Sequence, residues 1–180
     1  MPDQKSAPPM QKAEPSIQVI AQYVKDLSFE NPHAPESLVS GWPPPETSVQ
    51  IFLAQQHIKD NAFESSLHFR IEAKNKQDGR MAFIIDLHYG ALVALNNIPK
   101  ESQQAVLMVE VPKLLFPFVR EIVAGQTSQG GYPPLYLTPI SFETIYINEM
   151  KRKQAEAQKV EDKPGEKDHL GEKDQTVGTA

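Results

Sequence analysis

The chain has 180 residues, of which 39% are apolar, and it carries a formal net charge of -5. This length fits one domain of ordinary size with tails, and the apolar content is sufficient for a hydrophobic core. The absence of cysteine excludes disulfides and thiolate metal sites, and no apolar run approaches the length that spans a membrane.

The charge is unevenly distributed along the chain. Residues 1–15 and 151–180 each balance acids against bases, so the whole net charge of -5 belongs to residues 16–150. An acidic folded body disfavours nonspecific nucleic-acid binding, which depends on Lys and Arg, and it suits a basic partner. The N-terminal residues lack the continuous apolar stretch of a signal peptide, so we expect a soluble, cytoplasmic protein without direct membrane insertion.

Four stretches are predicted to form antiparallel strands, beginning with residues 17–30. The alternation in this stretch predicts one face with Tyr23, Lys25, Leu27 and Phe29 and another with Val24, Asp26, Ser28 and Glu30. Residues 48–58 and 63–73 also alternate, and Asp78-Gly79 is typical of a hairpin turn before a fourth strand from Arg80. Gly90 is expected to mark a bulge or a bend in that strand.

Three features of this region each allow two interpretations. Trp42 lies in the proline-rich connection 31–46. Its side chain either packs this loop against the folded domain or forms the bottom of a binding groove. Asp26 and Glu30 lie roughly 13 Å apart along one strand face, which is either simply solvated or a binding surface. Ile84 shares a strand face with Asp86 and His88, so either a second layer within an oligomer or a docking partner is expected to cover it.

The second half of the chain is predicted to be helical. A short helix over 99–109 is separated by Pro112 from a helix over 113–128, in whose first turn Pro117 is expected. Gly130-Gly131 ends this helix, and the stiff apolar loop that follows either fills the core or walls an apolar groove. Ser141 is expected to open a last helix.

The sequence contains no Walker, GxGxxG, GxSxG or HExxH motif. His57, His68 and His88 could converge across neighbouring strands, but without cysteines or a carboxylate at ligand spacing we predict no metal site. No pair of acidic residues is singled out for acid–base catalysis. We therefore predict neither an enzyme nor a cofactor.

Two blocks of the sequence resemble SecB, the bacterial protein-export chaperone. The first is YVKDLSFENPHAPESL at 23–38, and the second combines LLFPFVREIV at 114–123 with GGYPPLYLTPISFETIY at 130–146. The resemblance implies an α+β fold with a four-stranded antiparallel sheet, a long helix, a proline-rich crossover loop and a C-terminal helix, assembled as a dimer of dimers. The expected organisation is a disordered tail at 1–15, a SecB-like chaperone domain at 16–154 and a disordered charged tail at 155–180.

The resemblance also implies a function and two surfaces. A SecB-like protein is an ATP-independent holdase that binds unfolded preproteins, keeps them translocation-competent and delivers them to SecA. The residues expected along the client-binding groove are Trp42, Tyr132, Leu135, Tyr136, Phe142 and Tyr146. The residues expected to receive the basic tail of SecA are Asp26, Glu30, Ile84 and Asp86.

Two departures from the family pattern bear on these expectations. The C-terminal tail is longer and richer in alternating Lys and Glu than expected, so the SecA contact attributed to family tails is not carried over to it. Aspartate at position 86 keeps the negative charge of the family pattern, but its side chain is shorter and reaches less far. The alternative is a SecB-like chaperone devoted to a single client, such as a toxin–antitoxin component, for which an intact acidic patch would be unnecessary.

Overall fold

The computed structural model describes residues 14–39 and 41–161, with side chains described up to residue 155. The strands are β1 (Ser16–Glu30), β2 (Pro45–Lys59), β3 (Ala62–Asn75) and β4 (Met81–Asn96). The helical elements are η1 (Glu36–Leu38), α1 (Lys100–Ala105), η2 (Val106–Glu110), α2 (Val111–Gln129) and α3 (Phe142–Glu161). The expected tails lie mostly outside the described residues, and α3 continues to Glu161, past the expected domain end at 154.

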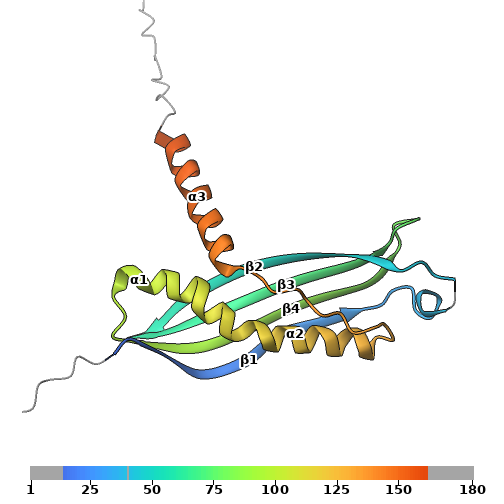
Figure 1. Cartoon of the computed structure of the whole chain (residues 1–180), viewed down its shortest axis with the longest axis horizontal. Coiled ribbons are helices and arrows are strands. Elements are labelled where there is room, and N and C mark those ends of the chain that lie inside the picture. Colours follow the sequence, from blue (N-terminus) through green and yellow to red (C-terminus); the bar gives the residue numbers. More distant parts are fainter. Residues whose placement is uncertain (1–13, 40, 162–180) are drawn as a thin grey trace, which may run out of the picture. The chain divides into compact units, whose positions relative to one another are not determined.

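The four strands form one antiparallel sheet in the order β1-β4-β3-β2 (Figure 1). The connection between β1 and β2 therefore leads from one edge of the sheet to the other. Asp78-Gly79 makes the predicted β3–β4 hairpin, in which the Asn75 N–H donates to the Arg80 carbonyl at 2.9 Å and Gly79 has a φ of 73°. The predicted four-stranded antiparallel sheet is confirmed.

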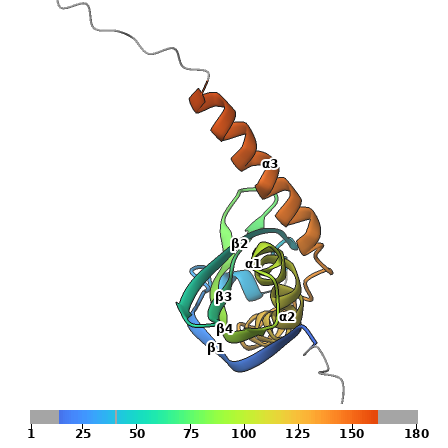
Figure 2. The same cartoon turned by 90° about the vertical axis from the view of Figure 1, so that its left-hand side faces the viewer.

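The core lies between one face of this sheet and α2. On β3, Leu67, Phe69 and Ile71 are 0% exposed, as strict alternation predicts for a strand with one buried face. The α2 residues Leu115, Val119 and Val123 are also 0% exposed, because spacings of four place them on one helix stripe. Figures 1 and 2 show α1 and α2 on the same face of the sheet. Burying such a side chain stabilises the fold by about 1.5–3 kcal/mol.

The helical run before the crossover loop differs from the prediction. Pro112 does not separate two helices, because α1, the π-helical turn η2 and α2 follow one another without a gap. Pro112 lies in the first turn of α2, where a missing N–H costs little. Pro117 lies inside α2 and not in its first turn, so the expectation for it was wrong. Its side chain is exposed, so the carbonyl left without a donor one turn earlier can be solvated.

The predicted face assignment of β1 is wrong before Asp26. The pairing of β1 with β4 shifts by one residue between Val24 and Asp26, so this β-bulge reverses the alternation. Leu27 and Phe29 pack toward the core as predicted. Tyr23 instead lies on the opposite sheet face, where its hydroxyl donates to Glu64 Oε1 at 2.6 Å.

Gly90 leaves room for the Tyr23 ring, which contacts Glu64. Tyr23 on β1 reaches across β4 to β3, and a Cβ at Gly90 would lie 3.1 Å from the Tyr23 ring. The bulge or bend that the sequence predicted at Gly90 lies in β1 instead. Gly90 itself permits the close approach of the Tyr23 ring. Burial, followed by the hydrogen bond to Glu64, raises the pKa of Tyr23 to about 12. Hydrogen bonds from Tyr23 and Lys25 hold the pKa of Glu64 below its usual range.

The C-terminus of α2 and the N-terminus of α3 lie where the sequence predicts them. Gly131 has a φ of 85° just after α2, and the Tyr132 N–H donates to the Thr127 carbonyl at 3.0 Å, which closes the helix C-terminus. The Thr144 N–H donates to Ser141 Oγ at 3.2 Å, so Ser141 caps α3 as predicted. From residue 147 onward α3 belongs to a second unit, in which Arg152 pairs with Glu149 at 2.8 Å.

Candidate functional site

The four residues expected to contact SecA lie on adjacent strands and on the same sheet face. Glu30 of β1 is directly opposite Ile84 of β4, and Asp26 is opposite His88, two residues beyond Asp86. This face is the one opposite the core, which we call the outer face. The sheet register therefore brings together residues from two sequence blocks that are more than 50 positions apart.

Asp26 and Glu30 present free carboxylates on the outer face. Both side chains are exposed, and neither carboxylate has a hydrogen-bond or ion-pair partner within residues 14–39 and 41–155. Ile84 is half-buried and lies between Glu30 of β1 and Glu72 of β3 in the sheet register. An apolar side chain flanked by carboxylates suits a partner segment that is both basic and partly apolar.

Asp86 is held by its neighbours on the sheet. Its Oδ2 accepts a hydrogen bond from Arg70 Nη1 at 3.2 Å, and its Oδ1 lies 2.9 Å from His68 Nε2 and 3.4 Å from His88 Nε2. Arg70 also donates to Glu72, which Lys74 contacts at 2.8 Å. Asp86 is therefore the most constrained of the four residues expected at the SecA surface.

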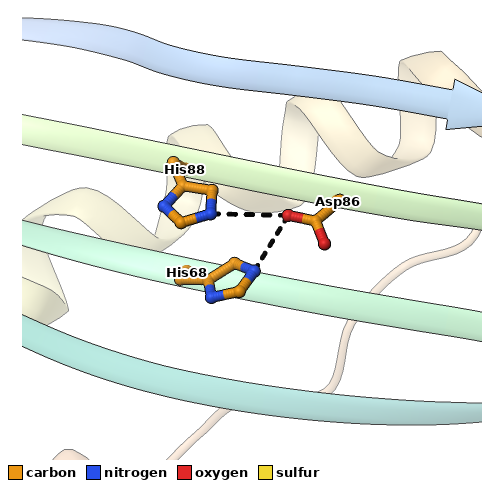
Figure 3. A group of neighbouring side chains, drawn as sticks. All are labelled: His68, Asp86 and His88. Atoms are coloured by element: carbon orange, nitrogen blue, oxygen red, sulfur yellow. Dashed lines mark hydrogen bonds and ion pairs between the residues drawn. The ribbon is translucent and has the colours of Figure 1, made fainter.

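Two of the three strand histidines converge in the structure. His68 and His88 converge, as Figure 3 shows, but the His57 ring lies against Phe63 and its Nε2 is 2.9 Å from the Asp60 carbonyl oxygen. The premise that no carboxylate lies at ligand spacing was wrong, because Asp86 contacts both imidazoles. The strand pattern placed Asp86 and His88 on one face, but it could not provide the register that adds His68.

An apolar cleft of about 240 Å³ lies between β2 and the crossover loop, residues 130–141. Its apolar lining consists of Val49, Ile51, Leu135, Tyr136, Leu137 and Ile140. Tyr136, which is 66% exposed, also borders a second cleft of about 520 Å³ between the loop and α2. Two expected groove residues, Leu135 and Tyr136, thus lie on an open apolar surface. Sequence reasoning did not place Val49 and Ile51 there, because strand alternation does not reveal which loop covers a strand.

Trp42 and Tyr132 make anchoring contacts. The Arg80 guanidinium carbon lies 4.3 Å from the centroid of the half-buried Trp42 ring, which favours the interpretation that Trp42 pins its loop to the body. The Tyr132 hydroxyl lies 2.7 Å from Ser37 Oγ and 3.0 Å from both Asn31 Oδ1 and the Ala82 carbonyl oxygen. Tyr132 therefore connects the crossover loop to the β1–β2 connection.

Replacing Tyr132 by phenylalanine is expected to lower the free energy of unfolding by about 1–3 kcal/mol, because Ser37 and Asn31 lose a partner in a partly buried site. Urea unfolding at fixed protein concentration measures this change. Tyr136→Phe is the matched control, since its ring is exposed and its hydroxyl makes no hydrogen bond within residues 14–39 and 41–155, and it should change stability by less than about 0.5 kcal/mol. Equal unfolding midpoints for the two variants would contradict an anchoring role for the Tyr132 hydroxyl.

Phe142 and Tyr146 lie deeper than the other expected groove residues. Phe142 is 1% exposed and packs edge-on against Phe116, with ring centroids 6.0 Å apart. Tyr146 is half-buried and packs against the same core. In this arrangement a client cannot reach Phe142, so its expected place on the groove surface is corrected to a place in the core beneath it. The apolar pattern of the loop gave no indication of this difference in depth.

The sheet, the long helix and the loop form a fold that is also found in a solved structure. A SecB-like chaperone of Mycobacterium tuberculosis, in complex with a peptide from an antitoxin, superposes with a TM-score of 0.57, covering 69% of this chain and 91% of that chain. Its sequence is 18% identical, so this likeness shows the fold alone. No helix within residues 14–39 and 41–161 is long and apolar enough to cross a membrane.

Sequence comparison identifies the family. The profile of SecB, the preprotein translocase subunit SecB, matches residues 10–153. The protein-export protein SecB of Bradyrhizobium sp. is 43% identical over 159 residues, which cover 88% of this chain and 93% of that protein. That of Bradyrhizobium diazoefficiens is 40% identical over 148 residues, covering 82% and 91%. The chain belongs to the SecB family of protein-export chaperones, and the single-client alternative is not favoured.

Proposed function

We propose that this protein is an ATP-independent holdase that binds unfolded preproteins in the cytoplasm, keeps them translocation-competent and delivers them to SecA. Family membership across 88% of the chain at 43% identity to a protein-export SecB carries this proposal. A protein that binds the unfolded state and not the folded state delays folding by mass action, without a nucleotide cycle.

Client binding is assigned to the apolar clefts beside the crossover loop. The lining of the first cleft, with Val49 on β2 and Leu135 and Tyr136 on the loop, offers apolar contacts without a fixed pattern of polar partners. Pro133, Pro134 and Pro139 stiffen the loop and lower the entropy cost of holding this surface open. Many weak apolar contacts along one extended client give avidity with little sequence selectivity.

SecA binding is assigned to the outer face at Asp26, Glu30, Ile84 and Asp86. The free carboxylates of Asp26 and Glu30 attract a basic segment, and Ile84 between acidic neighbours gives that segment an apolar contact. Charges on an exposed surface mainly set the association rate and the choice of partner. Client and SecA then bind different surfaces, so a loaded chaperone can still engage SecA.

The proposed assembly is a homotetramer, a dimer of dimers. Leu114 and Phe118, four residues apart on α2, are 47% and 42% exposed, so this helix carries large apolar side chains on a side that residues 14–39 and 41–155 leave partly exposed. Symmetric pairing through such a helix buries the same surface on both subunits. Joining the clefts of several subunits lengthens the surface available to one client.

The solution mass tests this function, measured by light scattering after size exclusion, alone and with an unfolded preprotein. The expected result is a mass four times that of the 20.1 kDa chain, and co-elution with the unfolded client but not with its folded form. A monomer that ignores the client would mean that the family fold is present without the holdase function.

A further inference from the structure

His68, Asp86 and His88 form a compact cluster on the outer face of the sheet (Figure 3). His68 of β3 is directly opposite His88 of β4 in the sheet register, and Asp86 lies two residues from His88 on the same strand face. The Nε2 atoms of both rings face the same carboxylate oxygen, at 2.9 Å from His68 and 3.4 Å from His88. One potential ligand atom from each residue lies within 4.8 Å of the others.

Two imidazoles and one carboxylate are a donor set that binds Zn²⁺ and neighbouring divalent transition metals in proteins. The two rings are stacked, with centroids 3.8 Å apart and an interplanar angle of 16°. A bound cation would accept a lone pair from the Nε2 atom of each ring.

The metal-bound geometry requires only side-chain movement. Zn–N distances are about 2.0–2.1 Å, so both Nε2 lone pairs must point at a common ion. The stacked rings reach this arrangement by rotation about their Cβ–Cγ bonds, a torsion with broad minima. The ion takes the Nε2 lone pair of each ring, so any proton on Nε2 moves to Nδ1 of that ring or to solvent.

Arg70 orients the carboxylate for this role. Its Nη1 donates to Asp86 Oδ2 at 3.2 Å, which leaves Oδ1 facing the imidazoles. Such contacts behind a ligand fix its direction. Glu72 accepts a hydrogen bond from Arg70 Nε at 3.2 Å and offsets part of the guanidinium charge, while Asp26, opposite His88, adds a negative charge beside the site.

The cluster is accessible but held in place. The side chains of His68, Asp86 and His88 are 27%, 23% and 40% exposed, so an ion can enter and water can complete its coordination. The Phe52 ring packs on His68 at a centroid distance of 5.3 Å. We propose that His68, Asp86 and His88 form a site for one divalent transition-metal ion per chain, with Zn²⁺ as the ion best matched to these ligands.

This proposal does not depend on export activity, and metal titration tests it. Tag-free protein is treated with EDTA, exchanged into metal-free buffer at pH 7.5 and titrated with ZnCl₂ in a calorimeter, and Co²⁺ absorption reports the coordination. The expected result is one Zn²⁺ per chain with micromolar affinity. His68→Gln and His88→Gln are each expected to weaken binding by about tenfold or more, since each removes one of three ligands.

His57→Gln is the matched control, because His57 lies on the same sheet but outside the cluster, and it should bind Zn²⁺ like the unmodified protein. Circular dichroism and solution mass check that each variant keeps its fold and assembly. Unchanged Zn²⁺ affinity in the variant with both His68→Gln and His88→Gln would overturn the proposal. So would an unmodified protein that binds no Zn²⁺, since the cluster would then be a hydrogen-bonded group only.

Discussion

Replacing both Asp26 and Glu30 by alanine is expected to weaken SecA binding by about tenfold or more, a loss of about 1.4 kcal/mol. The two carboxylates are exposed and have no partner in the described part of the chain, so their removal leaves no buried charge unpaired. The loss should appear mainly in the association rate. It should shrink as salt is raised, because salt screens exposed charges.

Titration of purified SecA at low and high ionic strength measures this effect. Tetramer mass and retention of an unfolded client should stay unchanged, because the outer face is separate from the clefts beside the crossover loop. The control is Glu101→Ala with Glu110→Ala, which makes the same charge change at exposed positions on α1 and η2. This control should bind SecA normally.

Two outcomes would contradict the assignment of the outer face. If client retention fell together with SecA binding, Asp26 and Glu30 would support the fold or the client surface and not a separate partner surface. If the control weakened SecA binding equally, the net charge of the chaperone would govern the interaction, and these two positions would have no special role.

The elements of this fold are readable from the sequence where burial imposes a period. On β3, alternation correctly separates Phe69 and Ile71 in the core from His68 and Arg70 on the outer face. The spacing of Leu115, Val119 and Val123 predicts the buried stripe of α2, and Gly131 and Ser141 mark the helix ends. Each of these patterns is local, so no knowledge of the partner element is needed.

The errors arise where pairing between elements decides the outcome. A one-residue bulge in β1 turns Tyr23 to the outer face, and no local pattern reports the bulge. The contact of Asp86 with His68 likewise depends on the register of β3 with β4. The prediction that Pro112 separates two helices is wrong, because the π-helical turn η2 joins α1 to α2. Faces are local properties of a strand, whereas register belongs to the whole sheet.

Depth within the crossover region is the other property that the sequence did not provide. Tyr136 and Phe142 are both large aromatic residues in the same block, yet their exposed fractions are 66% and 1%. Phe142 lies against Phe116 of α2, whereas Tyr136 borders both clefts. Substitutions at these two positions can therefore distinguish an effect on the core from an effect on the client surface.

Phe142→Ala is expected to lower the free energy of unfolding by about 3–5 kcal/mol, because it removes a fully buried ring and leaves a cavity beside Phe116. Urea unfolding measures this loss at one fixed protein concentration, since assembly and folding are coupled. Phe142→Leu keeps most of the apolar volume and should recover much of the stability. Any loss of client retention in Phe142→Ala should follow the fraction of unfolded chaperone.

Tyr136→Ala is the counterpart at the surface. It should change the free energy of unfolding by less than about 0.5 kcal/mol, because the ring is mostly solvent-exposed, yet weaken client retention in the same co-elution assay. A Phe142→Ala protein with unchanged stability and lost client retention would return Phe142 to the groove surface, where the sequence placed it. The expected result is that Phe142→Ala mainly loses stability and Tyr136→Ala mainly loses client retention. This result would establish that the clefts bind clients through the exposed face of the loop, above a core that Phe142 stabilises.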